Sequence, residues 1–398
     1  MASASICPVY NPSHLDTQRF WDRELVRERP AIDVPVGLPK NIASPLAWKG
    51  ADIASKEPEW KLDLTDEEVV MVEKALLGFE FKFQDLSKLS ASTFELPTEF
   101  SQRLRKLSDQ LYNGVGFQII HGLDPTKYTA RQNMIMYAGI SAHICPQRGF
   151  VDVFGKAVIA HIVNVQASKD DPKSTAPAFT NVPLSFHTDN CEIMAFFYLD
   201  TALEGGQTVL SSIWQTYNEL AAERPDVLHT LTQPWVLDTF KPVSLQPPRH
   251  VRPLQRVDSD KLPILFRFSR YPITGFQRGR NPELPEPTTA QQEAADCIQF
   301  RAAKNSITLP VVKGDILLVN DMALFHAREA FDDGGIPMKR HLVKMYMRDP
   351  EQGWEIPLSI MENEWKTSYT PNQPDGTRVE TWDVAYKPGI EELSMLNG

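Results

Sequence analysis

Two residues that can bind a metal ion stand close together near the middle of the chain. His187 and Asp189 are separated by one residue, in the run Phe186-His187-Thr188-Asp189. In an extended segment, side chains two positions apart project from the same face, so this spacing can aim an imidazole and a carboxylate at one point. Such a pair also occurs by chance in many proteins, and a metal site therefore requires a third ligand from elsewhere.

The best candidate for the third ligand is His326, far along the chain. It follows Ile316–Asn320, an apolar stretch that begins after a glycine turn and is typical of a buried strand. Two histidines and one carboxylate on one face form the facial triad of non-haem Fe(II) oxygenases, which leaves coordination positions open for a cosubstrate and O₂. A catalytic zinc site also uses three protein ligands, so the three residues alone do not select the metal.

Two further residues favour iron together with a keto acid. Arg340 begins the next expected strand, where an arginine can present two parallel N–H donors to a carboxylate. Thr208 follows Gly205 and Gly206, which allow a tight turn, and its hydroxyl can reach the same carboxylate. A keto acid that chelates the metal and extends its far carboxylate to Arg340 and Thr208 would account for all five residues.

Lys344, Val343 and Met345 are candidates for the substrate site on the same expected strand. Lys344 lies four residues after Arg340, so on a regular strand the two side chains share a face, and Lys344 could hold an anionic group of a substrate. A lysine that faces solvent near the strand end is the alternative. Val343 and Met345 take the other face and are expected in the core, although a bulge would turn them toward the pocket.

Residues beside the metal ligands could shape or support the site. Leu184 and Phe186 flank the ligand segment and are expected to line the pocket wall. Asn190 could be a hydrogen-bonding partner of the site or a simple turn residue. Asn320 and Asp321 precede His326 and could orient its ring, with the same alternative open.

Four segments of the chain together resemble a known enzyme family. In order, the chain contains FHTDN, LDTALEGGQTVL, GDILLVNDMALFHAREAFDD and KRHLVKMYMRDP. These segments are similar to those of Fe(II)/2-oxoglutarate-dependent dioxygenases of the taurine dioxygenase (TauD/TfdA-like) family, most of all its fungal branch. The resemblance covers residues 90–355 and implies a double-stranded β-helix, or jelly-roll, fold. It also implies iron ligands at His187, Asp189 and His326, and a 2-oxoglutarate site at Thr208 and Arg340.

The resemblance implies an enzyme that uses Fe(II), 2-oxoglutarate and O₂ to oxidise an unactivated C–H bond. Halogenating relatives replace the ligand carboxylate with a small residue, so Asp189 favours hydroxylation, desaturation or oxidative cyclisation. Fungal relatives often serve specialised metabolism, and some oxidise small α-amino acids, including those that form aziridines. We therefore expect a small carboxylate-bearing substrate, with an amino acid as the first candidate.

The spacing around Arg340 departs slightly from that of taurine dioxygenase. The segment 332–335 lengthens the distance from His326, which makes taurine a poor candidate substrate and leaves Lys339 as an alternative inward-facing residue. A catabolic dioxygenase of the same family, acting on a sulfonate or a xenobiotic anion, remains an alternative. A jelly-roll metal enzyme without a keto acid and a non-catalytic binding protein are two others. Arg340 and Thr208 argue against the former, and the intact triad argues against the latter.

The expected elements are a few helices followed by many short strands. Helices are predicted from 66, at 97–112, 127–142, 215–223 and 288–304, and strands at 116–122, 158–165, 195–199, 208–212, 235–240, 264–268, 306–309, 316–320 and 341–347. This pattern predicts a mainly β fold with flanking α-helices. We expect residues 1–58 to form an extended arm, with partial disorder as the alternative, and 59–398 a single domain with its β core at 150–350. The polar loop 168–180 is the candidate lid, with an ordinary surface loop as the alternative.

Charge and composition exclude several classes of partner. The 398 residues carry 51 acids against 41 bases, a net charge of −10, with no basic run, which disfavours nucleic acid and anionic membranes. We find no transmembrane stretch and no targeting signal, so a cytoplasmic protein, with homo-oligomers open, is expected. The four cysteines are Cys7, Cys145, Cys191 and Cys297. Because they lie far apart in the sequence, we expect reduced thiols and neither a disulfide framework nor a cysteine zinc site.

Overall fold

Two mainly antiparallel sheets form the centre of the protein. The computed structural model describes residues 12–152, 154–165, 175–189, 191–239, 248–257, 259, 261–275, 279–356 and 363–389. Within these residues the larger sheet has seven strands in the order β1-β2-β14-β6-β17-β3, and β4 also pairs with β17. Its strands are β1 (Lys61–Asp63), β2 (Phe117–His121), β3 (Gln147–Arg148), β4 (Ala160–Val163), β6 (Ile193–Asp200), β14 (Ile316–Asn320) and β17 (His341–Arg348).

The smaller sheet faces the larger one. Its order is β13-β8-β15-β5, with β5 at Leu184–His187, β8 at Thr208–Ser212, β13 at Ile307–Thr308 and β15 at Leu324–Arg328. A hydrogen bond of 2.7 Å between the hydroxyls of Tyr198 on β6 and Thr208 on β8 joins the two sheets. The sandwich confirms the expected mainly β fold with a jelly-roll core. Three two-stranded ribbons flank it: β7 (Glu204–Gly205) with β16 (Phe331–Asp332), β9 (Trp235–Leu237) with β10 (Arg249–Val251), and β11 (Leu254–Arg256) with β12 (Ile264–Phe266).

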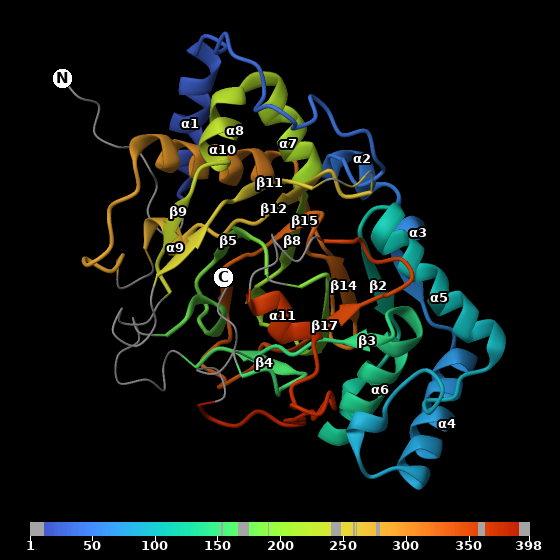
Figure 1. Ribbon diagram of the computed structural model, residues 1–398. Helices are drawn as coiled ribbons and strands as arrows, with labels where there is room; N and C mark the ends of the chain where they lie inside the picture. Colours follow the sequence, from blue (N-terminus) through green and yellow to red (C-terminus); the bar gives the residue numbers. More distant parts are fainter. Residues whose placement is uncertain are drawn as a thin grey trace.

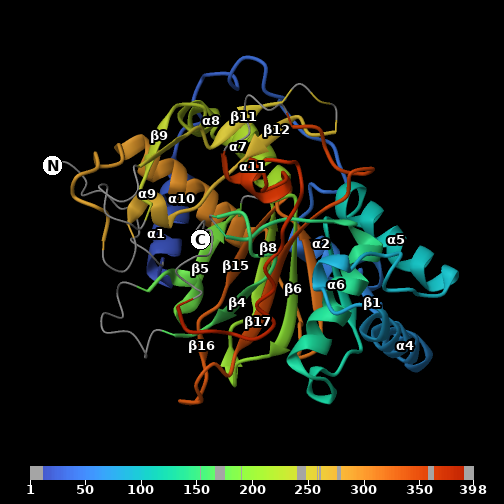
Figure 2. The same ribbon diagram turned by 60° about the horizontal axis from the view of Figure 1, so that its bottom comes forward.

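Helices gather in two groups around the sheets (Figures 1 and 2). One group contains α4 (Asp66–Lys82), α5 (Thr98–Asn113) and α6 (Ala130–Ile144); the other contains α1 (His14–Val26), α7 (Ile213–Glu223), α8 (Pro225–Leu231) and α10 (Thr289–Lys304). The short helices are α2 (Gly50–Ala54), α3 (Glu57–Trp60), α9 (Tyr271–Thr274) and α11 (Asn363–Tyr369). Tyr137 of α6 stacks on Phe197 of β6, so the first group covers the outer face of the larger sheet. None of the described helices is both long and apolar enough to cross a membrane.

The predicted helices form where apolar spacing and capping residues agree. Thr65 caps α4 and accepts a hydrogen bond from the backbone of Glu68, whose side chain accepts one in return from the Thr65 N–H. Thr288 and Gln291 form the same reciprocal cap at α10. Helix α8 was not predicted, because its seven residues are too few to show a helical period.

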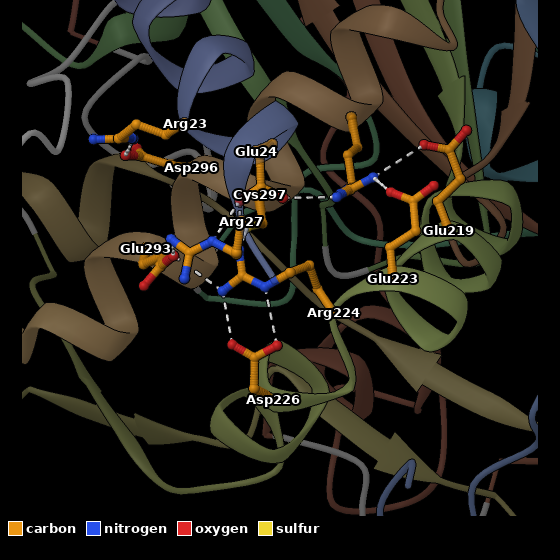
Figure 3. Close-up of polar contacts among 11 residues, drawn as sticks. Arg23, Glu24, Arg27, Glu219, Glu223, Arg224, Asp226, Glu293, Asp296 and Cys297 are labelled. Carbon is orange, nitrogen blue, oxygen red and sulfur yellow. Dashed lines mark hydrogen bonds and ion pairs between the residues drawn. The ribbon is translucent and has the colours of Figure 1, made fainter. Parts of the chain in front are cut away.

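The N-terminal segment differs from the extended arm that we expected. Residues 14–26 form α1, which begins at the N-cap Ser13 and buries Phe20 against Phe300 of α10. Glu24 of α1 binds two buried arginines, Arg224 (Nη1–Oε1 2.7 Å) and Arg301 (Nη2–Oε2 2.9 Å). Figure 3 shows Glu24 and Arg224 within this ion-pair network. The sequence pattern missed this helix because its partners come from distant segments, and its own apolar face is narrow.

Two other expectations lie partly outside the described residues. Of the candidate lid 168–180, the structure describes the end from 175, and Arg328 holds that end by donating to the carbonyls of Ala178 (3.1 Å) and Thr180 (2.7 Å). Cys145, Cys191 and Cys297 are buried free thiols, whereas Cys7 lies outside the described part of the chain.

Candidate metal centre and active site

Neighbouring strands bring His187, Asp189 and His326 together. His187 on β5 and His326 on β15 are register partners, and their ring centroids lie 4.0 Å apart. Each of the three residues offers one ligand atom, and these atoms all lie within 4.8 Å of one another. All three side chains are buried. The spacing along the sequence thus corresponds to a single cluster of two imidazoles and one carboxylate between the sheets.

The two imidazoles are in the state that a metal requires. The Nδ1 of His187 lies 2.8 Å from the Ser185 carbonyl, which can only accept, so Nδ1 donates and Nε2 keeps its lone pair. The Nδ1 of His326 lies 3.4 Å from Asp321 Oδ1. Burial lowers the pKa of His187 to about 3 and that of His326 to about 4, so both rings are neutral at physiological pH. Neutral imidazoles beside a carboxylate fit a divalent iron ion.

Asp189 is held as a carboxylate by two residues of β17. Lys344 Nζ lies 2.8 Å and the Tyr346 hydroxyl 3.0 Å from the same oxygen, Oδ2. Burial by itself would raise the pKa of Asp189, but the opposing effect of the neighbouring charges, chiefly that of Lys344, outweighs it and lowers that pKa. Lys344 therefore faces the site, as its spacing from Arg340 predicts, and its ammonium group contacts the Asp189 carboxylate.

Arg340, Tyr198 and Thr208 form a second corner of the site. Arg340 is 4% exposed and its guanidinium lies over the Phe331 ring, 5.2 Å from the centroid. Burial raises the pKa of Tyr198 to about 12, although the charge of Arg340 acts to lower it. The Tyr198 hydroxyl forms a hydrogen bond with the Thr208 hydroxyl. A Cβ at Gly206 would lie 3.0 Å from Arg340 Nε, so this glycine lets the chain pass close to the guanidinium.

Arg340 also lacks an acidic partner. In the described ranges no carboxylate forms an ion pair with it, although Asp333 accepts its backbone N–H at 3.1 Å. A buried cation without an anionic partner is costly unless a ligand supplies the negative charge. Lys339 instead pairs with Asp200 (Nζ–Oδ2 2.7 Å) at the surface, so of the two basic residues Arg340 faces inward. The corner therefore fits the far carboxylate of 2-oxoglutarate.

The remaining sequence candidates lie in several places. The register of β15 and β5 shifts between His326 and Arg328, so that Leu184 pairs with Arg328 and lies on the same face of the sheet as His187. The side chain of Leu184 packs against Tyr271. Phe186 belongs to the main hydrophobic core, and Asn190 lies outside the described residues. Asp321 approaches His326, whereas Asn320 donates to the Leu111 carbonyl (3.0 Å) and supports the backbone.

Val343 and Met345 face away from the cluster of His187, Asp189 and His326. Both are fully buried in the main core and pair with Phe197 and Ala195 of β6. Phe197 stacks on Tyr137 of α6, which places this face of β17 against the helices. The bulge that would turn these two residues toward the pocket occurs between His341 and Leu342, before them, so the regular alternation holds where they stand.

Three residues of the site were missed in the sequence. Tyr346 shares the face of Lys344 two residues on, and the alternation of β17 could have identified it. Tyr198 has no local signal, because its partner Thr208 comes from the other sheet. Arg267 is the residue that follows β12. Two residues further on, Ser269 forms an antiparallel β-bridge with His187, and the Phe268 carbonyl accepts a hydrogen bond from Thr188 N (2.8 Å). Continuing that register puts Arg267 opposite Asp189, and its charge acts to lower the pKa of Asp321, against the larger effect of burial.

Comparisons with known proteins agree with this geometry. Residues 82–346 match the model of the family described as "Taurine catabolism dioxygenase TauD, TfdA family". The taurine hydroxylase-like protein SAT17 of Stachybotrys chartarum is 30% identical over 335 residues, which cover 82% of this chain and 85% of that protein. FR-33289 synthase of Streptomyces rubellomurinus is 23% identical over 266 residues, covering 65% and 76%.

Solved structures share the fold at low sequence identity. The non-haem iron oxygenase OrfP, in complex with Fe and alpha-ketoglutaric acid, has a TM-score of 0.52 and 15% identity, and the match covers 72% of this chain and 94% of that one. Asparagine oxygenase has a TM-score of 0.55 and 13% identity, with 74% and 98% covered. With the family model matching most of the chain, the protein belongs to the TauD/TfdA dioxygenase family and is an Fe(II)/2-oxoglutarate-dependent dioxygenase.

Proposed function

We propose that the enzyme oxidises an unactivated C–H bond of a small carboxylate-bearing molecule, and that its substrate class is an α-amino acid of specialised metabolism. The observation that supports this oxidation chemistry is that a candidate metal site and a candidate 2-oxoglutarate site occur together. A cluster of two neutral imidazoles and one carboxylate lies in the same barrel as a buried arginine that has no acidic partner among the described residues.

Each residue of the site has a defined task in this proposal. His187, Asp189 and His326 would hold Fe(II), which together with 2-oxoglutarate and O₂ supplies the oxidising chemistry. Arg340 would bind the far carboxylate of 2-oxoglutarate through two parallel hydrogen bonds. Thr208, whose hydroxyl is oriented by Tyr198, would bind the same group. The packed walls of both sheets keep water from this space.

Two observations support an amino-acid substrate. Structures of OrfP contain (3S)-hydroxy-L-Arg, and asparagine oxygenase was solved with 2S,3S-3-hydroxyasparagine, so this fold serves amino-acid oxidation elsewhere. In this chain Arg267 stands opposite Asp189 in the continued register, where its guanidinium could meet a substrate carboxylate. The Streptomyces relative is named as a synthase, which is in keeping with a biosynthetic role.

A mass-spectrometric screen tests the substrate class. The enzyme, loaded with Fe(II) and 2-oxoglutarate in air, is incubated with α-amino acids and, separately, with sulfonic acids, and succinate release above the substrate-free rate is measured. We expect coupled succinate release and a product oxidised by one oxygen atom or by loss of two hydrogens with an amino acid. Coupling with sulfonates alone would refute the amino-acid proposal.

A further inference from the structure

The contact between β17 and Asp189 points to a role for two residues that the family resemblance does not assign. Lys344 and Tyr346 both approach Oδ2 of Asp189, at 2.8 Å and 3.0 Å, and lie 3.5 Å from each other. Both hydrogen bonds end on Oδ2, so β17 fixes the carboxylate through one oxygen and leaves the other available to a metal ion.

The strand that carries the two residues is rigidly held. β17 pairs with β6 from His341 to Met347 and with β4 and β3 on its other edge, so it is an interior strand of the larger sheet. Lys344 stands opposite Phe196 and Ala160, and Tyr346 opposite Met194. Because both flanks are paired, the ammonium and the phenol reach Asp189 from fixed positions on one face.

Burial makes these contacts strong and specific. The side chain of Lys344 is 10% exposed and that of Asp189 is 4% exposed. A buried carboxylate needs both a compensating charge and hydrogen bonds. Lys344 supplies the charge together with a hydrogen bond, and Tyr346 supplies a second hydrogen bond. Lys344 is thus already paired with the Asp189 carboxylate, and its ammonium group is not an unpaired cation available to bind a substrate anion.

We propose that Lys344 and Tyr346 are positioning residues that clamp the metal-ligand carboxylate of Asp189. They hold its Oδ2 and orient the group before the ion arrives, and Lys344 serves Asp189 rather than the substrate. The inference rests on the proposed metal centre and deepens it. Outer partners that orient metal ligands typically contribute a factor of about 10 to 100 to metal affinity.

Metal binding without catalysis tests the clamp. Mn(II) is titrated into the metal-free protein while the EPR signal of free Mn(II) is recorded, and the visible spectrum of the Co(II) form reports the ligand geometry. We expect Tyr346→Phe and Lys344→Met each to weaken Mn(II) binding about 10- to 100-fold and to shift the Co(II) bands. Lys344→Arg should retain part of the affinity that Lys344→Met loses, because arginine keeps the charge.

Matched controls separate clamping from a general effect on folding. Tyr369→Phe removes another buried hydroxyl next to β17, one that donates to the Met347 carbonyl (3.0 Å). Lys339→Met removes a lysine that pairs with Asp200 near the start of the strand. Both controls should bind Mn(II) as the wild type does. If Lys344→Met cannot be purified folded, Tyr346→Phe decides, since it removes a single oxygen.

The outcomes are distinguishable from failure of the proposed function. Unchanged Mn(II) affinity and Co(II) spectrum in both variants would overturn the clamp while leaving the metal centre intact. Tighter binding by Lys344→Met would also overturn it, because the ammonium would then be a competitor of the ion. If the wild-type protein itself fails to bind Mn(II), Co(II) and Fe(II), the metal centre fails, and the clamp with it.

Discussion

His187 and His326 face each other across neighbouring strands as direct register partners, with their rings 4.0 Å apart. A register shift of one residue in either strand would turn one imidazole to the opposite face. The pairing of β5 with β15 therefore brings two histidines that are far apart in the sequence together as two of the three residues of the proposed metal site. β15 is held on its other edge by β8, with which it pairs along five residues.

Replacement of Arg340 should separate cofactor binding from metal binding. In Arg340→Met we expect 2-oxoglutarate affinity to fall about 100-fold, because two charge-assisted hydrogen bonds are lost, while Mn(II) affinity is unchanged. Isothermal titration of 2-oxoglutarate into the Mn(II) form measures the first, and EPR the second.

The same variant should unfold at an equal or higher urea concentration than the wild type when no ligand is present. Arg340 is buried and forms no ion pair within the described ranges, so methionine removes a charge that only a ligand can compensate. A strongly destabilised Arg340→Met protein would show that the guanidinium has a structural partner instead.

Gly206 should tolerate a methyl group worse than Gly335, although both adopt the left-handed conformation. Their φ angles are +75° and +74°, so alanine costs each site about 1–2 kcal/mol in backbone strain. At Gly206 the new Cβ would also lie 3.0 Å from Arg340 Nε, whereas at Gly335 nothing lies within 4 Å. We expect Gly206→Ala alone to weaken 2-oxoglutarate binding, measured by the same titration. Equal binding by both variants would contradict a crowded cofactor corner.

Glu24 should contribute measurably to stability, unlike an exposed acid in a similar pair. Glu24→Gln weakens charged hydrogen bonds to the buried Arg224 and Arg301, and we expect a loss of about 1–3 kcal/mol in the free energy of unfolding. Asp33, whose side chain is 83% exposed in its pair with Lys40, is the control, and Asp33→Asn should change little. Urea unfolding curves compare the two, and equal curves would show that α1 is not anchored through Glu24.

Acid should destabilise the protein through buried histidines. His341, whose Nε2 lies 2.7 Å from His161 Nδ1, has its pKa lowered to about 4 by burial and by the neighbouring His161. The unfolded chain takes up this proton near pH 6.5 and the folded protein only near pH 4, so stability is lost as the pH falls between these values. Replacing His341 with glutamine should flatten that slope in urea unfolding measured from pH 7.5 to 4.5. An unchanged slope would exclude His341 as a source of it.

The sequence reveals those parts of the site whose signal is local. His187, Asp189 and His326 stand in short motifs, and alternation along β17 puts Arg340 and Lys344 on the pocket side. The same alternation correctly directs Val343 and Met345 to the core. Tyr198 and Arg267 could not be found in this way, because their relation to the site arises only when separate sheets and ribbons meet.

The fold shows the same division between local and distant signals. Helices α4 and α10 contain their own capping residues and α5 has a clear apolar period, and all three form within a few residues of the expected bounds. Helix α1 depends instead on Arg224 and Arg301, which lie some two hundred residues or more away in sequence, so composition alone suggested an extended arm. The domain boundary at residue 58 stays a prediction, although α1 packs directly on α10.

One spectroscopic titration tests whether the protein holds Fe(II) and 2-oxoglutarate in a single centre. Fe(II) and then 2-oxoglutarate are added to the protein under strict exclusion of air, and the visible absorption is recorded. The proposed centre predicts a charge-transfer band that requires both additions, is absent in His187→Ala, and needs far more 2-oxoglutarate in Arg340→Met. A wild-type protein that binds Fe(II) and 2-oxoglutarate without such a band, or a band that persists in His187→Ala, would contradict the account.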